Sequence, residues 1–210
     1  MIFKICGLKN LETINCCERN NVDFYGMIFY EKSPRNISVN DAKILTEFSK
    51  KLKIKSVGVF VNHNINDLKK IISYLNLEYI QLHGSENQPY IDEIKKQSNL
   101  KIIKKISIQT AGDLDKIYKY KNIDYLLFDY KPTYNELPGG NSKSFDWNLI
   151  KARKIDLPWF ISGGINEGNI KKMQNILNPN GIDLSSGVEE SPGIKSNAKI
   201  NKLIRKFHDD

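Results

Sequence analysis

The chain has 210 residues, of which 40% are hydrophobic, enough to bury one sizeable core. No run of about 18 apolar residues occurs, which argues against a membrane span. The start MIFKICGLKN lacks the basic and apolar segments of a secretory signal, so we expect a cytoplasmic protein. Three cysteines without a Cys-x-x-Cys pair or a histidine cluster indicate neither disulfides nor a metal site.

The net charge of +8 raises the question of a nucleic-acid partner, because Lys and Arg contacts to phosphates supply most non-specific affinity. Lysines are spread over nearly every predicted helix, however, and acidic residues lie among them. This pattern favours a solvated basic surface over a polyanion-binding one. We therefore expect no nucleic-acid and no membrane partner, and a heparin column at low salt would test this.

Short apolar runs rich in β-branched residues predict strands, and each is followed by a polar segment with apolar residues three and four apart. The predicted strands are Phe3–Cys6, Phe24–Phe29, Ser56–Val61, Tyr79–Leu82, Lys101–Ile106, Tyr125–Phe128, Trp159–Ile161 and Ile182–Leu184. The predicted helices are a first one that holds Cys16 and Cys17, then Val39–Leu52, Asn66–Leu75, Gln88–Gln97, Thr110–Tyr120, Asp146–Ala152, Glu167–Leu177 and Asn197–Phe207. The alternation predicts an α/β protein with a single (β/α)8 TIM barrel over residues 1–210, a parallel eight-stranded barrel with outer helices.

A barrel of this kind keeps its working groups on the loops at the C-terminal ends of its strands. The polar residues predicted there include one cysteine, Cys6, and one isolated carboxylate, Asp129. The longest irregular stretch, Lys131–Ser144, is too short to separate two domains, and we expect it to be an active-site loop.

Two glycine-bearing turns follow the seventh and eighth predicted strands. Glycines let backbone amides approach an anion, and the start of a helix adds partial positive charge. No dinucleotide or nucleoside-triphosphate loop motif is present, so a single phosphate ester is the expected ligand. The residues expected to bind it are Gly163, Gly164, Asp183, Ser185, Ser186 and Gly187. Taken alone, Gly163-Gly164 could also be an ordinary turn.

Several short motifs stand at the strand ends and in the loops: Lys4-Ile5-Cys6-Gly7, Gln81-Leu82-His83-Gly84, Leu127-Phe128-Asp129, Phe145-Asp146-Trp147, Ser162-Gly163-Gly164-Ile165, Asp183–Glu189 and Lys32–Ser38. Together and in this order they resemble the phosphoribosylanthranilate isomerase family, and the resemblance spans essentially the whole chain. It implies an isomerase of tryptophan biosynthesis that acts on a small phosphorylated substrate without a cofactor. A homodimer is left open.

The activity that the resemblance implies is an Amadori rearrangement of N-(5-phosphoribosyl)anthranilate to 1-(2-carboxyphenylamino)-1-deoxy-D-ribulose 5-phosphate by general acid/base catalysis. The resemblance makes Asp129 the acid that protonates the furanose oxygen and Cys6 the base that removes the C2′ proton. Without it, Cys6 would be interpreted as a small buried hydrophobe, and Asp129 as a helix cap or a surface ion pair.

Both roles ask for a favourable pKa. A thiol with a pKa near 8.5 is largely protonated at pH 7, a deficit of about 2 kcal/mol, and Lys4 on the same strand face is the candidate cation to reduce it. Holding the Asp129 proton near pH 7 requires about 4 kcal/mol, which an apolar pocket or a substrate carboxylate could supply.

The resemblance also gives Arg35, on the loop after the second strand, the role of binding the anthranilate carboxylate; a solvated loop residue is the alternative. His83 either lines the pocket or is a structural histidine.

Two departures from the family are Ser142, where a glycine is usual, and Ser196, where an acid is common. The rival interpretations are another phosphosugar barrel enzyme, such as indole-glycerol-phosphate synthase or an aminoaldose isomerase, and an inactive barrel that binds a phosphorylated ligand or nucleic acid.

Overall fold

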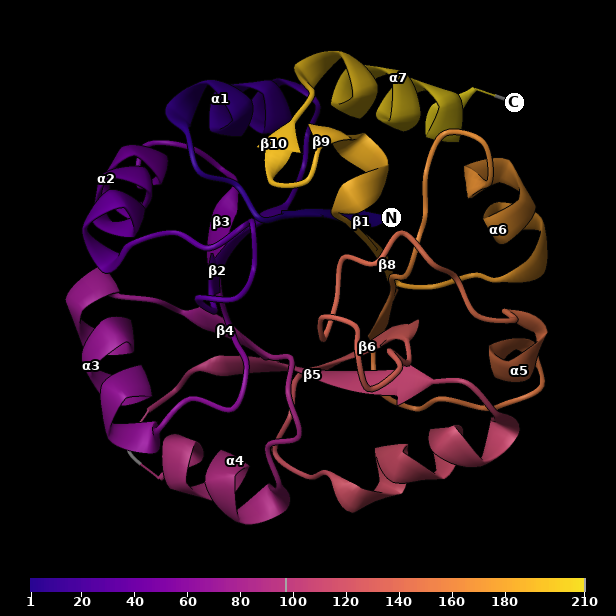
Figure 1. The fold of residues 1–210 in the computed structure, drawn as a ribbon, viewed down its shortest axis with the longest axis horizontal. Coiled ribbons are helices and arrows are strands. Elements are labelled where there is room, and N and C mark those ends of the chain that lie inside the picture. The colour runs from indigo at the N-terminus through magenta and orange to yellow at the C-terminus, as the bar shows by residue number, and fades with distance from the viewer. Residues whose placement is uncertain (97, 210) are drawn as a thin grey trace.

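The fold was obtained as a computed structural model that describes residues 1–96 and 98–209. Eight parallel strands close into a barrel in chain order, and helices surround it (Figure 1). The strands are β1 (Ile2–Cys6), β2 (Phe24–Phe29), β3 (Lys55–Phe60), β4 (Tyr79–Leu82), β5 (Lys101–Ile108), β6 (Tyr125–Tyr130), β7 (Trp159–Ile161) and β8 (Gly181–Leu184). The predicted TIM barrel is confirmed.

The outer ring consists of α-helices and one longer 3-10 helix. Its members are α1 (Leu11–Arg19), α2 (Val39–Ser49), α3 (Ile65–Leu75), α4 (Gln88–Lys95), η1 (Ala111–Lys119), α5 (Asn148–Lys151), α6 (Ile170–Ile176) and α7 (Asn197–His208). The segment predicted as a helix at Thr110–Tyr120 is the 3-10 helix η1. Gln97, the last residue of the helix predicted at Gln88–Gln97, lies outside the described residues.

Strand bounds agree with the predictions to within two residues, whereas one helix start does not. The helix predicted from Glu167 begins at Ile170, because a polar turn precedes it. In that turn the side-chain amides of Asn166 and Asn169 both donate to the Gly164 carbonyl oxygen, each at 2.9 Å. The glycine turn after β7 therefore does not lead directly into a helix.

The barrel closes between β1 and β8, where Lys4 pairs with Asp183 in the strand register. The lower interior of the barrel is apolar and includes Phe24, Val57, Ile103 and Phe160. A larger apolar layer lies between the strands and the helices. Buried charged side chains are thus placed toward the open end of a barrel whose base is filled with hydrophobic groups.

An unpredicted hairpin lies between β8 and α7. A short 3-10 helix, η2 (Ser186–Val188), is followed by β9 (Glu189–Ser191), which pairs with β10 (Ile194–Lys195). Ser196 then caps α7, since its hydroxyl oxygen accepts a hydrogen bond from the Lys199 N–H at 3.4 Å. The serine that departs from the family pattern therefore has a structural role.

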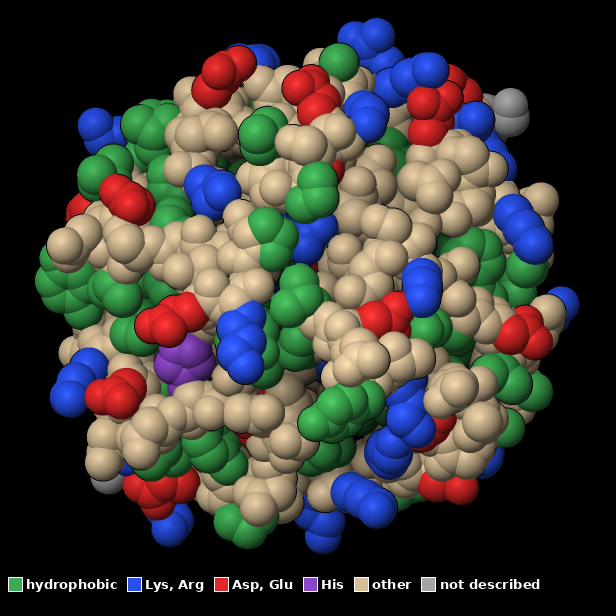
Figure 2. All heavy atoms as spheres, viewed as in Figure 1, with side chains coloured by type: hydrophobic (Ala, Val, Ile, Leu, Met, Phe, Trp, Pro, Cys, Tyr) green, Lys and Arg blue, Asp and Glu red, His purple; other side chains and the backbone are tan. Residues whose placement is uncertain are grey.

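The surface carries charges of both signs side by side. Figure 2 shows Lys and Arg interspersed with Asp and Glu over the face seen in Figure 1. Exposed ion pairs such as Lys50–Glu47 at 2.7 Å and Lys70–Asp67 at 3.2 Å belong to this surface. Among the described residues, no helix is long and apolar enough to cross a membrane.

Candidate active site

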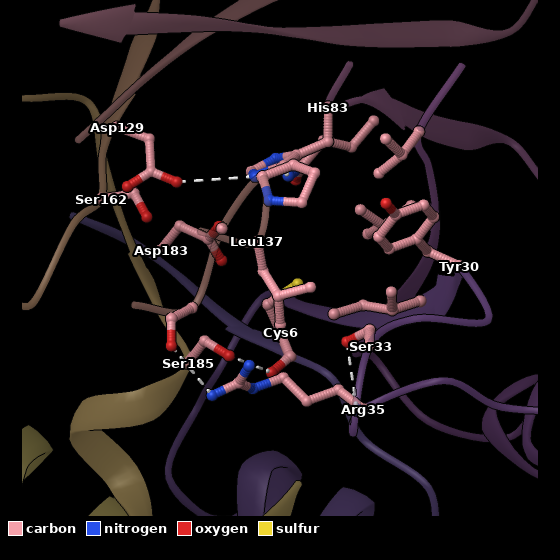
Figure 3. A pocket seen from close by; sticks show the side chains of 17 residues that line it. Cys6, Tyr30, Ser33, Arg35, His83, Asp129, Leu137, Ser162, Asp183 and Ser185 are labelled. Atoms are coloured by element: carbon pink, nitrogen blue, oxygen red, sulfur yellow. Dashed lines mark hydrogen bonds and ion pairs between the residues drawn. The ribbon is translucent and has the colours of Figure 1, made fainter. Parts of the chain in front are cut away.

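Cys6 and Asp129 line the same cavity at the C-terminal end of the barrel, although 123 positions separate them in the sequence. Arg35, His83 and Asp183 line it as well. Figure 3 shows Asp129 and His83 facing each other, with Cys6 beside Arg35 in another part of the cavity. The structure thus brings the proposed acid, base and carboxylate-binding residues around one space.

A second cavity adjoins the first, since Asp129, Asp183 and Ser185 line both. Its other walls come from residues 139–143 of the loop after β6 and from the turns after β7 and β8, which include Gly163, Gly164 and Ser186. Both glycines have positive φ, +88° and +63°, a conformation that L side chains rarely adopt. Backbone amides from two loops therefore surround a space in which a phosphate group could sit.

Gly187 differs from Gly163 and Gly164, because it serves the packing between two turns. A Cβ at this position would lie 1.9 Å from the Ile165 carbonyl oxygen, so the glycine allows the turns after β7 and β8 to pack closely. Ser185 is also engaged within the protein: its hydroxyl donates to the Cys6 carbonyl oxygen at 3.1 Å. Gly187 thus acts through backbone packing and Ser185 through its hydroxyl group, and direct ligand contact by either residue stays a prediction.

The Cys6 thiol lies beside a buried ion pair. Lys4 is fully buried, and its Nζ donates to Asp183 Oδ1 at 2.8 Å. Gly26 on β2 leaves room for these groups, since a Cβ there would lie 2.8 Å from Cys6 Sγ and 3.3 Å from Lys4 Nζ. Lys4 is thus the cation beside the thiol that the strand alternation predicts.

Burial raises the pKa of the Cys6 thiol above its ordinary value, and attraction to Lys4 opposes this shift without reversing it. For Lys4, burial favours the neutral amine, but attraction to Asp183 and Cys6 outweighs it and raises the pKa. The lysine therefore stays charged beside the thiol. The expectation that Lys4 offsets the cost of forming the thiolate holds only in part, because burial of the thiol has the larger effect.

Asp129 is buried at the end of β6. Its Oδ1 accepts a hydrogen bond from the Tyr130 N–H at 2.8 Å, and its Oδ2 lies 3.5 Å from His83 Nε2. Burial raises the pKa of Asp129 to about 6, although the nearby Lys105 ammonium and the Tyr130 N–H favour the carboxylate. This direction is the one that a general acid needs near neutral pH.

Lys105, on β5, is the second buried lysine near the cavity. Its Nζ donates to the Pro138 carbonyl oxygen at 2.9 Å. Burial lowers the pKa of Lys105 to about 8, and attraction to Asp129 only partly compensates. Lys105 was not predicted as a site residue, because it follows Lys104 directly and the alternation of this predicted strand does not say which of the two lysines points into the barrel.

Arg35 is buried and already paired within the protein. Its Nε donates to Glu189 Oε1 at 2.8 Å and its Nη2 to Glu189 Oε2 at 2.7 Å. Lys195 holds the same carboxylate at 2.6 Å. The alternative of a solvated loop residue for Arg35 is therefore wrong. One edge of its planar guanidinium is occupied by Glu189, and in the described chain no hydrogen bond from Nη1 is found.

The loop predicted at Lys131–Ser144 covers the cavity. Leu137, Pro138, Gly139 and Gly140 line it, and Arg35 Nη2 donates to the Gly140 carbonyl oxygen at 3.3 Å. The volume in which the centre of a water molecule fits within this cavity is about 60 Å³, room for a few water molecules.

Ser142, in the same loop, adopts φ = 56°, the left-handed conformation that the family's usual glycine would favour. The substitution of the family's glycine by serine has therefore not removed the left-handed turn at this position.

Comparison with known proteins identifies the family. Residues 3–206 match the family model described as N-(5′-phosphoribosyl)anthranilate isomerase. The chain is 42% identical over 194 residues to the N-(5′-phosphoribosyl)anthranilate isomerase of Sinorhizobium medicae, which covers 91% of this chain and 90% of that protein. The solved phosphoribosyl anthranilate isomerase of Thermotoga maritima is 31% identical with a TM-score of 0.87, covering 99% of both chains.

A second solved phosphoribosyl anthranilate isomerase is 30% identical with a TM-score of 0.82 and also covers 99% of both chains. That protein is in complex with reduced 1-(o-carboxyphenylamino)-1-deoxyribulose 5-phosphate. A family model over nearly the whole chain, a relative above 40% identity and these full-length structural matches agree. The chain therefore belongs to the N-(5′-phosphoribosyl)anthranilate isomerase family.

Proposed function

We propose that this isomerase catalyses the Amadori rearrangement of N-(5-phosphoribosyl)anthranilate in tryptophan biosynthesis, with Asp129 as general acid and Cys6 as general base. The observation that carries the proposal is the shared cavity, in which a carboxyl group with a raised pKa and a thiol beside a buried ammonium face the same space. The ligand of the solved relative, a reduced form of the product of this rearrangement, supports the same substrate class.

The chemistry has two proton transfers. The Asp129 carboxyl group protonates the furanose ring oxygen, the C1′–O bond breaks, and the nitrogen lone pair forms an iminium. The Cys6 thiolate then removes the C2′ proton, and the electron pair of that C–H bond forms the enolamine and neutralises the iminium nitrogen. The enolamine rearranges to the ketone, and a return of the thiol proton to the Asp129 carboxylate restores the starting state.

The phosphate ester belongs in the second cavity. The backbone of Gly163, Gly164 and Ser186 surrounds that space, and glycine there allows an anion to come close to the amides. Asp129 and Asp183 line both cavities, so a sugar that bridges them would place its ring beside the acid. Because the described helix α6 begins only at Ile170, the amides of the turn, rather than a helix start, would supply the donors.

Arg35 would bind the anthranilate carboxylate through its free Nη1 edge while Glu189 holds the other edge. Replacing Arg35 by lysine removes the planar fork and its two parallel hydrogen bonds to Glu189. We expect Arg35→Lys to raise KM by about tenfold with a smaller change in kcat, since one charge-assisted hydrogen bond contributes about 1.5–3 kcal/mol. An unchanged KM in steady-state kinetics would reject this role.

The function is tested by generating phosphoribosylanthranilate in situ and following the decay of its fluorescence. Cys6→Ser and Asp129→Asn should each lower kcat by at least about 10²-fold, the usual contribution of a general acid or base. Cys16→Ser is the matched control, because Cys16 is a buried thiol on α1 away from the cavity. Near-wild-type turnover in either cavity variant would contradict its role, and an inactive wild type would favour a barrel that only binds a phosphorylated ligand.

Three further expectations accompany this function. We infer that residues 1–210 form one domain, since one apolar layer joins strands and helices all around the barrel. We expect the protein to work in the cytoplasm, where a reducing environment keeps a thiol base free. The homodimer stays a prediction, and light scattering at micromolar concentration would decide it.

A further inference from the structure

Gln81, on β4, belongs to the Gln81-Leu82-His83-Gly84 motif, but neither the family resemblance nor the acid/base chemistry above gives this buried polar residue a role. Its side chain is fully buried, and it lines the same cavity as Cys6 and Asp129. Its Nε2 lies 2.7 Å from His83 Nδ1. Its Oε1 has no hydrogen-bond partner among residues 1–96 and 98–209. Because buried polar atoms are nearly always hydrogen-bonded, an unpaired oxygen in a binding cavity points to a ligand group.

The surroundings of His83 determine where its ring carries the hydrogen. The pKa of His83 lies well below its ordinary value, because the ring is buried and the nearby Lys105, Lys4 and Lys104 ammonium groups repel a further charge. The ring is therefore neutral, with one N–H. Its Nε2 lies 3.5 Å from Asp129 Oδ2, and the ring also interacts with the Pro138 carbonyl, which can only accept a hydrogen bond. Because Nδ1 faces the Gln81 amide nitrogen at 2.7 Å, we assign the ring hydrogen to Nε2.

The other ring nitrogen, Nδ1, then has a lone pair and must accept a hydrogen bond. Gln81 Nε2, at 2.7 Å, is the donor. This fixes the orientation of the Gln81 amide and leaves Oε1 as the atom without a partner. The tautomer of His83 and the free acceptor of Gln81 are thus two consequences of a single hydrogen bond.

We propose that Gln81 is a positioning residue of this isomerase: its amide keeps the hydrogen of His83 on Nε2, the ring nitrogen nearest Asp129, and its carbonyl oxygen accepts a hydrogen bond from an N–H or O–H group of the substrate. The part that concerns Asp129 rests on the proposed function. When Asp129 gives its proton to the substrate, the Nε2–H of a neutral histidine can stabilise the new carboxylate. A neutral histidine carries no positive charge, which would lower the pKa of Asp129 and so oppose its protonation before the reaction.

The first experiment needs no activity. The chain has three histidines, His63, His83 and His208, so the imidazole ¹⁵N signals can be assigned with single replacements of His63 and His208. We expect a protonated Nε2 and an unprotonated Nδ1 for His83 in the wild-type protein at pH 7.5. A protonated Nδ1 would overturn the proposal, whatever the enzyme does in the assay.

The second experiment changes the hydrogen-bond direction at Gln81. In Gln81→Glu the carboxylate can only accept, so the hydrogen of His83 should move to Nδ1, and kcat should fall by at least about tenfold. Gln81→Met removes both hydrogen bonds, so the two tautomers should mix and KM should rise as well, because the acceptor for the substrate is lost. Both variants should keep the barrel's circular dichroism spectrum.

Gln174→Met is the matched control. Gln174, on α6, also has an unpaired oxygen in the described part of the chain, but its amide donates to the Phe207 carbonyl at 3.1 Å, away from the cavity. Its replacement should leave kcat, KM and the His83 tautomer unchanged. A Gln81→Glu variant that keeps the wild-type tautomer, or one that changes it with full kcat, would overturn the proposal. A wild type with the expected tautomer but no isomerase activity would instead contradict the proposed function.

Discussion

The cavity has two walls that each contain a buried lysine and a buried carboxylate, yet they pair these groups differently. On the base wall, formed by β1 and β8, Lys4 Nζ contacts Asp183 at 2.8 Å beside the Cys6 thiol. On the acid wall, formed by β5 and β6, Lys105 donates to the Pro138 carbonyl at 2.9 Å and acts on Asp129 only through longer-range attraction.

This difference separates a permanent charge from a group that can lose its proton near neutrality. Direct contact with Asp183 helps to keep Lys4 charged, and its pKa is raised. Without such contact, burial dominates on the acid wall: the pKa of Asp129 rises to about 6 and that of Lys105 falls to about 8. Burial raises the pKa of both carboxyl groups, so the direct contact separates the two lysines: Lys4 keeps its proton, whereas Lys105 can lose its proton near neutral pH.

The largest effect is expected from removing the cation of the base wall. Lys4→Met leaves Asp183 as a buried charge without its partner, so the free energy of unfolding should fall by about 3–5 kcal/mol. The thiol also loses the ammonium that favours its charged form, and kcat/KM should fall by about 10²-fold or more. Denaturant unfolding and the fluorescence assay measure the two quantities separately.

A second buried pair provides the control for this variant. Lys104 on β5 is fully buried and contacts Glu86 at 2.7 Å behind the cavity wall. Lys104→Met should destabilise the fold by a similar amount and leave kcat/KM within a few-fold of the wild type. Equal losses of activity in both variants would mean that Lys4 acts only through stability.

The next effect is a flat pH profile between two widely separated limbs. The active form needs a protonated Asp129, with a pKa of about 6, and a thiolate at Cys6, whose pKa lies above 9.0. Between these two pKa values, each pH unit lowers the fraction of enzyme with a protonated Asp129 tenfold and raises the fraction with a Cys6 thiolate tenfold. The fraction of enzyme that has both is therefore constant, at about 10⁻³ or less. We expect kcat/KM to fall below pH 6 and above the Cys6 pKa. A narrow profile, in which both limbs lie within about one pH unit of neutrality, would contradict both directions.

A smaller effect should come from the lysine of the acid wall. Lys105 lowers the pKa of Asp129, so Lys105→Met should raise that pKa and move the low-pH limb upward by about one pH unit. Lys4→Met also removes a charge that acts on Asp129, but Lys105 is the larger influence. If the low-pH limb of the Lys105→Met profile stays in place, Lys105 does not act on the Asp129 pKa, and the difference between the two walls is contradicted.

The smallest effect concerns the loop that covers the acid wall. Ser142 has φ = 56°, and glycine relieves this strain at the expense of a more flexible unfolded chain. Ser142→Gly should therefore raise the free energy of unfolding by about 0.5–1 kcal/mol. Ser144→Gly, in the same loop without a positive φ, should lower it slightly, and thermal unfolding of both variants measures the contrast.

The sequence sufficed for features that depend on local periodicity. Alternation along β1 placed Lys4 and Cys6 on one face, and the order of strands brought Asp129 to the same end of the barrel. The partner of Arg35 was beyond this reasoning, because Glu189 is 154 residues away and reaches Arg35 through a hairpin of two very short strands. The net direction of the Cys6 pKa was also missed, since a sequence shows the nearby lysine but not how completely the thiol is buried.

The covering loop has a consequence for how quickly a ligand can enter. The Lys105–Pro138 and Arg35–Gly140 hydrogen bonds hold the loop over the cavity, so a ligand that enters from the loop side has to break them and displace the loop. Association should therefore be slower than diffusion and insensitive to ligand concentration once opening becomes the limiting step.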